Sequence, residues 1–227
     1  MRESGFADRY TVRPETWKDW RTAAAKDWRD QALAAGLHVL VPSDLDVIRG
    51  IAKRLAADPF VKNGVFDGEP ELSIVWQDRE TGVWLKARPD VTDLSARVIN
   101  DLKTTTSADG LSCRKAIGDF GYHVQLGLAV EGLMEIGAGD FSDGCMLTFA
   151  EKRRPYCVNV KPIDPNAIWT GRQIVRRAVR TFAECVKTGE WPGYDDSGRT
   201  TFLPAWLEKR MEEETKAGLL PEPLHIG

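Results

Sequence analysis

The stretch from Lys86 to Thr106 constrains the fold and the chemistry of this chain most strongly. It predicts two β-strands joined by a turn at residues 94–96. The first includes Val83, Leu85, Ala87 and Val91, and the second runs from Arg97 to Lys103. Side chains alternate between the two faces of a strand, so Asp101 and Lys103 project from the same face. Asp90 precedes the turn on the neighbouring strand and can reach that face. The sequence therefore predicts two carboxylates and an ammonium group at one point.

This cluster predicts a site for a divalent cation. Two adjacent carboxylates need a compensating charge, and Mg²⁺ prefers a few carboxylates together with water and phosphate oxygens. Lys103 would then hold or polarise an attacking water, which outlines a site for phosphodiester hydrolysis. The alternative is a hairpin with charged residues on its solvated face. The apolar residues Val98, Ile99 and Leu102 favour a partly buried strand, where charges are costly unless they are paired or bound to metal.

The order of these residues resembles a known nuclease signature. Pro89-Asp90, followed eleven residues after the acid by Asp101-Leu102-Lys103, is similar to the motif of the PD-(D/E)XK nuclease superfamily. The surrounding residues most resemble the RecE-like (exonuclease VIII) exonucleases of phages and prophages. This similarity covers about residues 69–194 and includes Glu71-x-Ser73, Trp76, Thr81-Gly82, Lys86-x-Arg88, Thr104-Thr105, Tyr122-His123-x-Gln125, Glu151-Lys152 and Trp191-Pro192-Gly193-Tyr194.

The resemblance implies a fold and an activity. The expected fold is α/β, with a restriction-endonuclease-like core in which helices flank a central mixed β-sheet. The expected activity is metal-dependent hydrolysis of DNA phosphodiester bonds, running 5′ to 3′ on linear double-stranded DNA in phage-type recombination. Mg²⁺ is the expected cofactor, and Mn²⁺ is an alternative. The expected partners are double-stranded DNA ends, a single-strand annealing protein and further copies of the same chain.

The resemblance also assigns roles to individual residues. Asp90 and Asp101 would bind the metal directly, with the backbone carbonyl of Leu102 as a third ligand. Glu71 would bind a second metal ion or orient a metal-bound water. Lys103 would lower the pKa of the attacking water, and Gln125 would position that water or a phosphate. Contacts to DNA are expected from Lys86, Arg88, Thr104, Thr105 and Tyr122.

Two departures from the family pattern leave alternatives open. Family members usually carry a tyrosine four residues after the glutamine, where this chain has Ala129, and Tyr122 is a partial substitute. They also carry a histidine well upstream of the first acid, and His38, His123 and His225 do not occupy that place. One alternative is therefore a DNA-binding module with weakened catalysis. Another is a subunit that docks a recombination partner through Trp17, Trp20, Trp28 and a C-terminal helix.

Composition sets the broad class of the protein. The chain has 227 residues, of which 42% are hydrophobic and 29% charged, as expected for one soluble globular domain. It contains no apolar run of membrane-spanning length, and its first residues lack the apolar core of a signal peptide, so a cytoplasmic location is expected. The net charge of −3 means that any DNA-binding surface is local. Its four cysteines lack C-x-x-C spacing, which favours reduced thiols over a zinc site.

The chain order predicts three segments: an N-terminal helical segment (1–60), a nuclease core (61–194) and a tail (195–227). In the first segment, residues 1–13 read as irregular. A helix is expected from Pro14 to Ala35, with the three tryptophans on one stripe. A second helix is expected from a capping-box-like pair, Ser43 and Asp46, to a point before Pro59.

The core and tail predict further elements. A strand that includes Glu71 is followed by a turn at 78–82, and Asp109-Gly110 reads as a mobile loop at the mouth of the site. Further elements are expected at 120–134 (helix), 142–150 and 155–163 (strands), 165–187 (helix) and 206–211 (short helix), with 221–227 loose. In the long helix, the predicted buried stripe is Ile168, Val175, Val179, Phe182 and Val186. Beside it, Arg172, Arg176 and Arg180 form either a solvated face or a ridge that tracks DNA phosphates.

Overall fold

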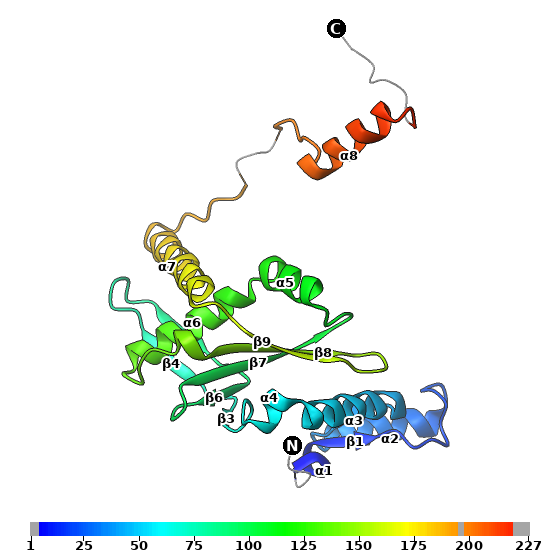
Figure 1. Ribbon diagram of the computed structural model, residues 1–227. Helices are drawn as coiled ribbons and strands as arrows, with labels where there is room; N and C mark the ends of the chain where they lie inside the picture. The colour runs from blue at the N-terminus through cyan, green and yellow to red at the C-terminus, as the bar shows by residue number, and fades with distance from the viewer. Residues whose placement is uncertain (1–4, 195–197, 220–227) are drawn as a thin grey trace. The chain divides into compact units, whose positions relative to one another are not determined.

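A five-stranded mixed β-sheet forms the centre of the fold in this computed structural model, which describes residues 5–194 and 198–219 (Figure 1). The strand order is β3-β6-β7-β8-β9. β7 and β8 pair in parallel, and the other neighbours pair antiparallel. The strands are β3 (Glu69–Pro70), β6 (Val91–Asp93), β7 (Val98–Thr105), β8 (Cys145–Glu151) and β9 (Val158–Pro162).

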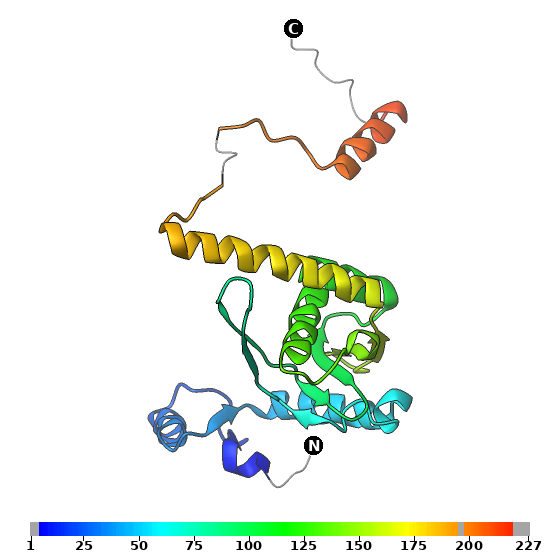
Figure 2. The same cartoon turned by 90° about the vertical axis from the view of Figure 1, so that its left-hand side faces the viewer.

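Helices cover both faces of this sheet. α5 (Gly110–Asp119), α6 (Tyr122–Glu135) and α7 (Pro165–Thr188) lie on one side, and α3 (Pro42–Ala57) and α4 (Pro59–Lys62) lie on the other (Figures 1 and 2). Apolar side chains of β7, β8 and α6 fill the space beneath the first group, among them Ile99, Leu147, Phe149, Leu126, Val130 and Leu133. The predicted α/β architecture, a central mixed sheet flanked by helices, is confirmed.

A separate two-stranded hairpin packs beside α6. It pairs β4 (Ile74–Gln77) with β5 (Trp84–Ala87), and its turn is closed by bonds between Asp78 and Val83 and between Gly82 and Asp78, both 2.8 Å. Ile74 and Trp76 are buried while Val75 and Gln77 are exposed, so the predicted alternation and turn are confirmed. The prediction of one strand running on to Val91 is wrong, because the chain leaves the hairpin at Arg88-Pro89-Asp90 and enters another sheet as β6. Proline cannot donate a ladder hydrogen bond, which favours this break.

The N-terminal segment differs from the expectation. Residues 5–13, predicted to be irregular, include α1 (Phe6–Arg9) and β1 (Tyr10–Val12), and β1 pairs in parallel with β2 (His38–Leu40). The helix predicted from Pro14 begins only at α2 (Ala23–Ala34), where the hydroxyl of Thr22 accepts a bond from Ala25 N at 3.2 Å. Pro14 lies outside the helix, and Thr22, eight positions after it, is a good N-cap residue. The helix therefore starts after Thr22 and not at Pro14.

The predicted second helix is present as α3, with a different cap. It starts at Pro42, and the Asp44 carboxylate accepts a bond from Val41 N at 3.2 Å, so the capping acid is Asp44 and not Asp46. Proline in the first turn is favourable because its missing N–H would be unpaired there in any case. α3 ends at Ala57, before Pro59, as predicted.

α7 begins as the sequence predicts and then extends past α6 (Figure 2). The Asp164 carboxylate accepts a bond from Asn166 N at 2.7 Å, and Pro165 follows as the first helical residue. The predicted stripe is buried at Ile168, Val175 and Val179. It is not buried at Phe182 and Val186, which are 47% and 59% exposed, because the final turns lie beyond the core.

The remaining predictions are confirmed with shifted ends. The predicted strand at 142–150 is preceded by the short 3₁₀ turn Ser142–Gly144, and the helix predicted at 206–211 is the longer α8 (Ala205–Lys216). α8 belongs to a second unit, residues 188–227. Residues 221–227, expected to be loose, lie outside the described residues. In the two described ranges, no helix is long and apolar enough to cross a membrane.

Candidate active site

The β6–β7 pair brings Asp90 and Asp101 together. Asp101 lies in the middle of β7 and is 2% exposed, and Asp90 directly precedes β6, whose Val91 faces Asn100. The Asp90 amide donates to Asp101 Oδ1 at 3.4 Å, and Asp90 Oδ2 accepts from the Leu102 amide at 2.7 Å. The antiparallel register therefore places two acids that are eleven residues apart at one end of the strand pair.

Lys103 is held beside these acids by three partners. Its ammonium forms an ion pair with Asp101 Oδ2 and donates to Gln125 Oε1 at 2.9 Å. It also lies over the ring of Tyr122, 4.7 Å from the centroid, where the negative face of the ring attracts a cation. The side chain is only 17% exposed. The predicted placement of Asp101 and Lys103 on one face of the strand is therefore observed, and α6 fixes where the ammonium points.

The position of α6 depends on a close crossing with α7. A Cβ atom at Gly127 of α6 would lie 2.7 Å from Arg172 N, and one at Gly171 of α7 would lie 2.2 Å from the carbonyl oxygen of His123. Both distances are too short for real Cβ atoms. Glycine at both positions thus lets the helix backbones approach, and α6 in turn carries Gln125, whose amide also donates to Asp101 Oδ1 at 3.4 Å.

Glu71 does not lie on a strand, which corrects the sequence-based placement. It has a φ of +53° in the turn after β3, and its amide donates to the Asp90 carbonyl at 3.0 Å. Its side chain is 61% exposed and pairs with Arg88, whose Nε lies 3.3 Å from Glu71 Oε2. Pro70 and the turn at Glu71 end strand β3 before Glu71. The residue is therefore next to the acid pair through its backbone, but its carboxylate faces solvent and Arg88.

A pocket of about 230 Å³ opens next to the acid pair. Its lining includes Lys86, Arg88, Asp101, Gln125 and Ala129. Ala129 is the position where the family pattern has a tyrosine, and the small side chain leaves that wall open. Tyr122, expected as a partial substitute, instead contacts Lys103. The pocket therefore combines two cationic side chains with one acid of the pair.

The threonines at the end of β7, and the loop that follows this strand, are only partly available for DNA. Thr104 is exposed, while the hydroxyl of Thr105 donates to the Ser107 carbonyl at 2.9 Å. The predicted mobile loop at Asp109-Gly110 is wrong, because Asp109 caps α5 and accepts bonds from the amides of Leu111 and Ser112 at 2.8 and 3.0 Å. The hydrogen bonds from Ser107 and Ser112 hold the pKa of Asp109 well below its usual range.

The electrostatics of the acid pair favour a bound cation. Burial raises the pKa of Asp90, and the nearby charges of Asp101 and Glu71 raise it further, against opposing effects of the Leu102 amide and Lys103. A carboxylate that is buried near a second one gains most from a positive charge. Across residues 5–194 and 198–219, no group of three or more His, Cys, Asp or Glu side chains gathers as a metal cluster. Two acids with the Leu102 carbonyl and waters suit Mg²⁺, which keeps several waters, and not a closed structural zinc site.

The arginines of α7 form an ion-pair network in place of the two arrangements expected from the sequence, a solvated face or a ridge of phosphate contacts. Arg176 donates to Asp78 at 2.6 Å and to Glu131 at 3.2 Å, Arg172 donates to Glu131 at 2.8 Å, and Arg180 forms a two-point pair with Glu80. These contacts fix the hairpin and α6 to α7. Burial acts to raise the pKa of Asp78, but bonds from Thr81 and Arg176 outweigh it and the pKa is lowered.

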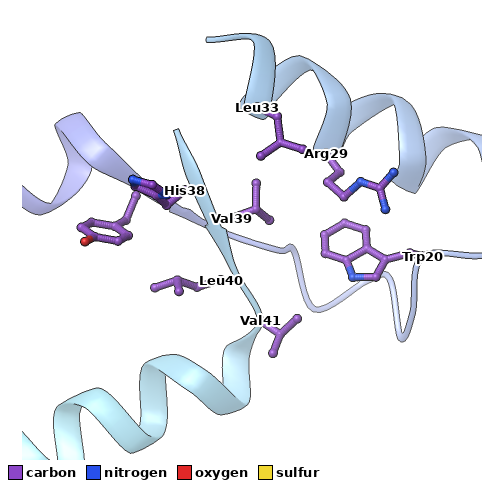
Figure 3. Close-up of a pocket in the computed structure, with 8 residues that line it drawn as sticks. Trp20, Arg29, Leu33, His38, Val39, Leu40 and Val41 are labelled. Atoms are coloured by element: carbon purple, nitrogen blue, oxygen red, sulfur yellow. The ribbon is translucent and has the colours of Figure 1, made fainter. Parts of the chain in front are cut away.

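A second pocket lies in the N-terminal segment (Figure 3). It measures about 550 Å³ and contains no carboxylate among its lining residues, which are Tyr10, Trp20, Arg29, Leu33, His38, Val39, Leu40 and Val41. Figure 3 shows the Arg29 guanidinium over the Trp20 ring, 5.7 Å from its centroid. Trp28 packs against Trp17 and Trp20 at 5.8 and 6.3 Å, so the tryptophans form a local aromatic cluster although only one of them lies on a helix.

The fold and the acid pair with its lysine define a PDDEXK-like domain. Residues 23–203 match the family described as the PDDEXK-like domain of unknown function (DUF3799), and the chain belongs to this family. The superfamily resemblance is thus confirmed, and nucleases of this superfamily generally use divalent metal ions.

Comparison with solved structures supports the same fold. A candidate exonuclease from Eubacterium rectale is 14% identical, with a TM-score of 0.51 over 86% of this chain and 81% of that chain. At this identity the likeness shows the fold alone. The protein SSO0001 is 17% identical, with a TM-score of 0.32 over 76% of this chain and 72% of that one, which is too low to show a shared fold. No curated protein matches the chain.

Proposed function

We propose that this protein is a divalent-metal-dependent deoxyribonuclease. The observation that carries the proposal is the pair of the buried Asp101 and the partly buried Asp90, with Lys103 in contact and held in place by Gln125 and Tyr122. A partly buried carboxylate with a raised pKa beside a second carboxylate is an unfavourable arrangement for stability alone, and such groups are concentrated at functional sites. Membership of the PDDEXK-like family supports the same conclusion.

The geometry suggests how each side chain would act. Asp90, Asp101 and the Leu102 carbonyl would hold a divalent ion, which when bound lowers the pKa of a water and offsets the charge of the attacked phosphate. The Lys103 ammonium would stabilise the negative charge that develops on the phosphate oxygens, because it is already oriented by Gln125 and needs little reorganisation. Lys86 and Arg88, which line the adjoining pocket, would neutralise neighbouring phosphates.

A more specific proposal concerns the DNA substrate and the metal ion. The resemblance to RecE-like exonucleases supports 5′-to-3′ digestion of linear double-stranded DNA with Mg²⁺ or Mn²⁺, and the Eubacterium rectale protein of like fold is itself named as a candidate exonuclease. On the same basis we propose DNA ends, a single-strand annealing protein and further copies of this chain as partners, in a cytoplasmic recombination process. Glu71, although exposed, would remain a candidate for orienting a metal-bound water, since its backbone contacts Asp90.

The test compares linear duplex DNA labelled at either 5′ or 3′ ends with closed circular DNA, in Mg²⁺, Mn²⁺ or EDTA. We expect ion-dependent release of the 5′ label from linear DNA and an intact circle. Asp101→Asn preserves the size of the side chain and should abolish release while the circular dichroism spectrum is unchanged. Asp46→Asn, a matched change at an exposed position on α3, should act as wild type. Digestion in EDTA, or undiminished digestion by Asp101→Asn, would refute the proposal.

A second candidate function is favoured by one observation, the small side chain of Ala129 in the pocket wall. A missing tyrosine could leave a module that binds DNA and metal without efficient hydrolysis. Calorimetry with Mn²⁺ on wild type and Asp101→Asn separates the two functions. Metal binding that depends on Asp101, together with DNA binding but no cleavage, would favour the binding module.

A further inference from the structure

Phe120 is a large apolar side chain that remains exposed at the edge of the candidate site. It caps the end of α5 and is 71% exposed. Its ring centroid lies 5.6 Å from that of Tyr122, at an interplanar angle of 31°. The same Tyr122 ring carries the Lys103 ammonium at 4.7 Å. A direct series of contacts therefore leads from the exposed ring to the lysine beside the acid pair.

The backbone holds Phe120 in place. Its amide donates to the Ala116 carbonyl at 3.0 Å, and the next residue, Gly121, has a φ of +65° and donates to Gly118 at 3.3 Å before α6 begins. A left-handed residue at this point lets two helices meet in a tight turn, which L side chains rarely allow. The ring is thus presented by two helix ends and not by a long loop, although its exposed face buries nothing in the core.

The pocket beside the acid pair carries two cations. Gln125, which accepts the Lys103 bond, lines the pocket that also contains Lys86 and Arg88. The site thus has an exposed ring, Phe120, next to the partly buried Tyr122, and two cations line the adjoining pocket. An aromatic face combined with a cationic path is the arrangement by which proteins bind single-stranded nucleic acid, with bases stacked on the rings and phosphates near the cations.

We propose that Phe120 stacks on an unpaired base next to the phosphodiester held at the acid pair, so that the site takes single-stranded or frayed DNA and not an intact duplex. A base inside a duplex has both faces covered by its neighbours, whereas an unpaired base can offer a face to the ring. This inference rests on the proposed function, since it assumes that DNA occupies the site.

Binding to DNA, measured in EDTA to prevent ion-dependent cleavage, tests this inference. The probes are a single-stranded oligonucleotide and a blunt duplex, each with 2-aminopurine near its 5′ end. We expect wild type to quench the single-stranded probe more strongly than the duplex. Phe120→Leu keeps an apolar side chain without the ring, and it should weaken single-strand binding by about 5- to 150-fold and remove the quenching. Phe120→Trp should retain both, as should Phe202→Leu, a matched change at an exposed phenylalanine of the second unit.

The outcomes separate this inference from the proposed nuclease activity. Wild-type affinity and quenching in Phe120→Leu would overturn the stacking role. An equal loss of affinity for both probes in Phe120→Leu would overturn the preference for unpaired DNA. Phe120-dependent quenching in a protein that never cleaves DNA would support the stacking role while the proposed activity fails. Cleavage that depends on Asp101 but not on Phe120, with single-strand binding unchanged in Phe120→Leu, would support the proposed activity and overturn the stacking role.

Discussion

The crossing of α6 and α7 offers a sensitive test of how the fold positions the candidate site. Gly171→Ala adds one methyl group at a place where a Cβ atom would lie 2.2 Å from the His123 carbonyl oxygen and 2.8 Å from its carbon. The obstructing atoms are backbone, so no rotation of a side chain can relieve the contact. His123 lies between Tyr122 and Gln125 in the first turn of α6. The variant must therefore move the helix turn that holds Lys103.

The size of the shift follows from the contact distance. Ordinary van der Waals contact begins at 3.4 Å, so α6 must retreat by roughly 1 Å. Overpacking of this kind costs about 1–3 kcal/mol of stability, which leaves most domains folded. A misplacement of about 1 Å in catalytic geometry can cost about 100-fold in rate. We therefore expect a small loss of stability and a large loss of metal-dependent DNA cleavage.

The assay pairs DNA digestion with urea denaturation for three proteins. Gly171→Ala should lose about 100-fold in digestion rate while retaining a cooperative unfolding transition. Gly110→Ala adds the same methyl group at the start of α5, where nothing lies within 4 Å, and should match wild type in rate. If Gly171→Ala digests DNA at the wild-type rate, the contact between α6 and α7 does not position Gln125 and Lys103, and the reasoning fails.

Two further predictions concern titration. Burial acts to raise the pKa of Asp78, but hydrogen bonds from Thr81 and Arg176 lower it. The ionised carboxylate therefore stabilises the fold at pH values above the unfolded pKa of about 3.9. This stabilisation is lost as the pH falls through the folded pKa. The gap in free energy of unfolding between wild type and Asp78→Asn should therefore shrink below about pH 4, and a constant gap would contradict the assignment. Burial raises the pKa of Cys145 to about 12, whereas Cys157 is exposed, so a thiol reagent at neutral pH should modify Cys157 rapidly and all four cysteines only after unfolding. Rapid labelling of Cys145 in the folded protein would refute this.

The arrangement of Asp90, Asp101 and Lys103 could be predicted because it depends on local geometry. Asp101 lies on β7, Asp90 directly precedes the neighbouring β6, and Asp101 and Lys103 are one pleat apart on β7. Period-two alternation determines the shared face, and the antiparallel register determines the meeting point. The sequence carried both signals within twenty residues.

Placements that depend on distant partners were not predictable from the sequence. Arg176 has the spacing of a residue on a charged helix face, but its partner Asp78 lies 98 positions earlier in the chain. A periodic pattern reports which residues share a face and not what covers that face. The predicted stripe on α7 failed at Phe182 for the same reason, since helix periodicity does not say where the core ends.

The wrong placement of Glu71 has a backbone cause. Alternating residues after Pro70 suggested a strand, but the positive φ of Glu71 turns the chain between β3 and β4, and the residue contributes its amide to Asp90 in place of its carboxylate. A positive φ at a residue other than glycine is uncommon and is found in turns or strained segments. No side-chain pattern in the sequence indicates it, so the turn becomes visible only in three dimensions.

The ion-pair network and the candidate site are connected through the same helices. Arg172 and Arg176 join α7 to Glu131 of α6, and the glycines at 127 and 171 bring the two helix backbones together, so α6 is fixed by contacts that do not involve Lys103. A rigid α6 is needed because a lysine ammonium between a carboxylate and a glutamine has other rotamers available in water. Fixing Gln125 and Tyr122 on a braced helix removes those choices before any substrate binds, which is the condition under which a charged group stabilises a transition state without reorganising. The arginines first considered as DNA contacts would then serve the site by holding its scaffold.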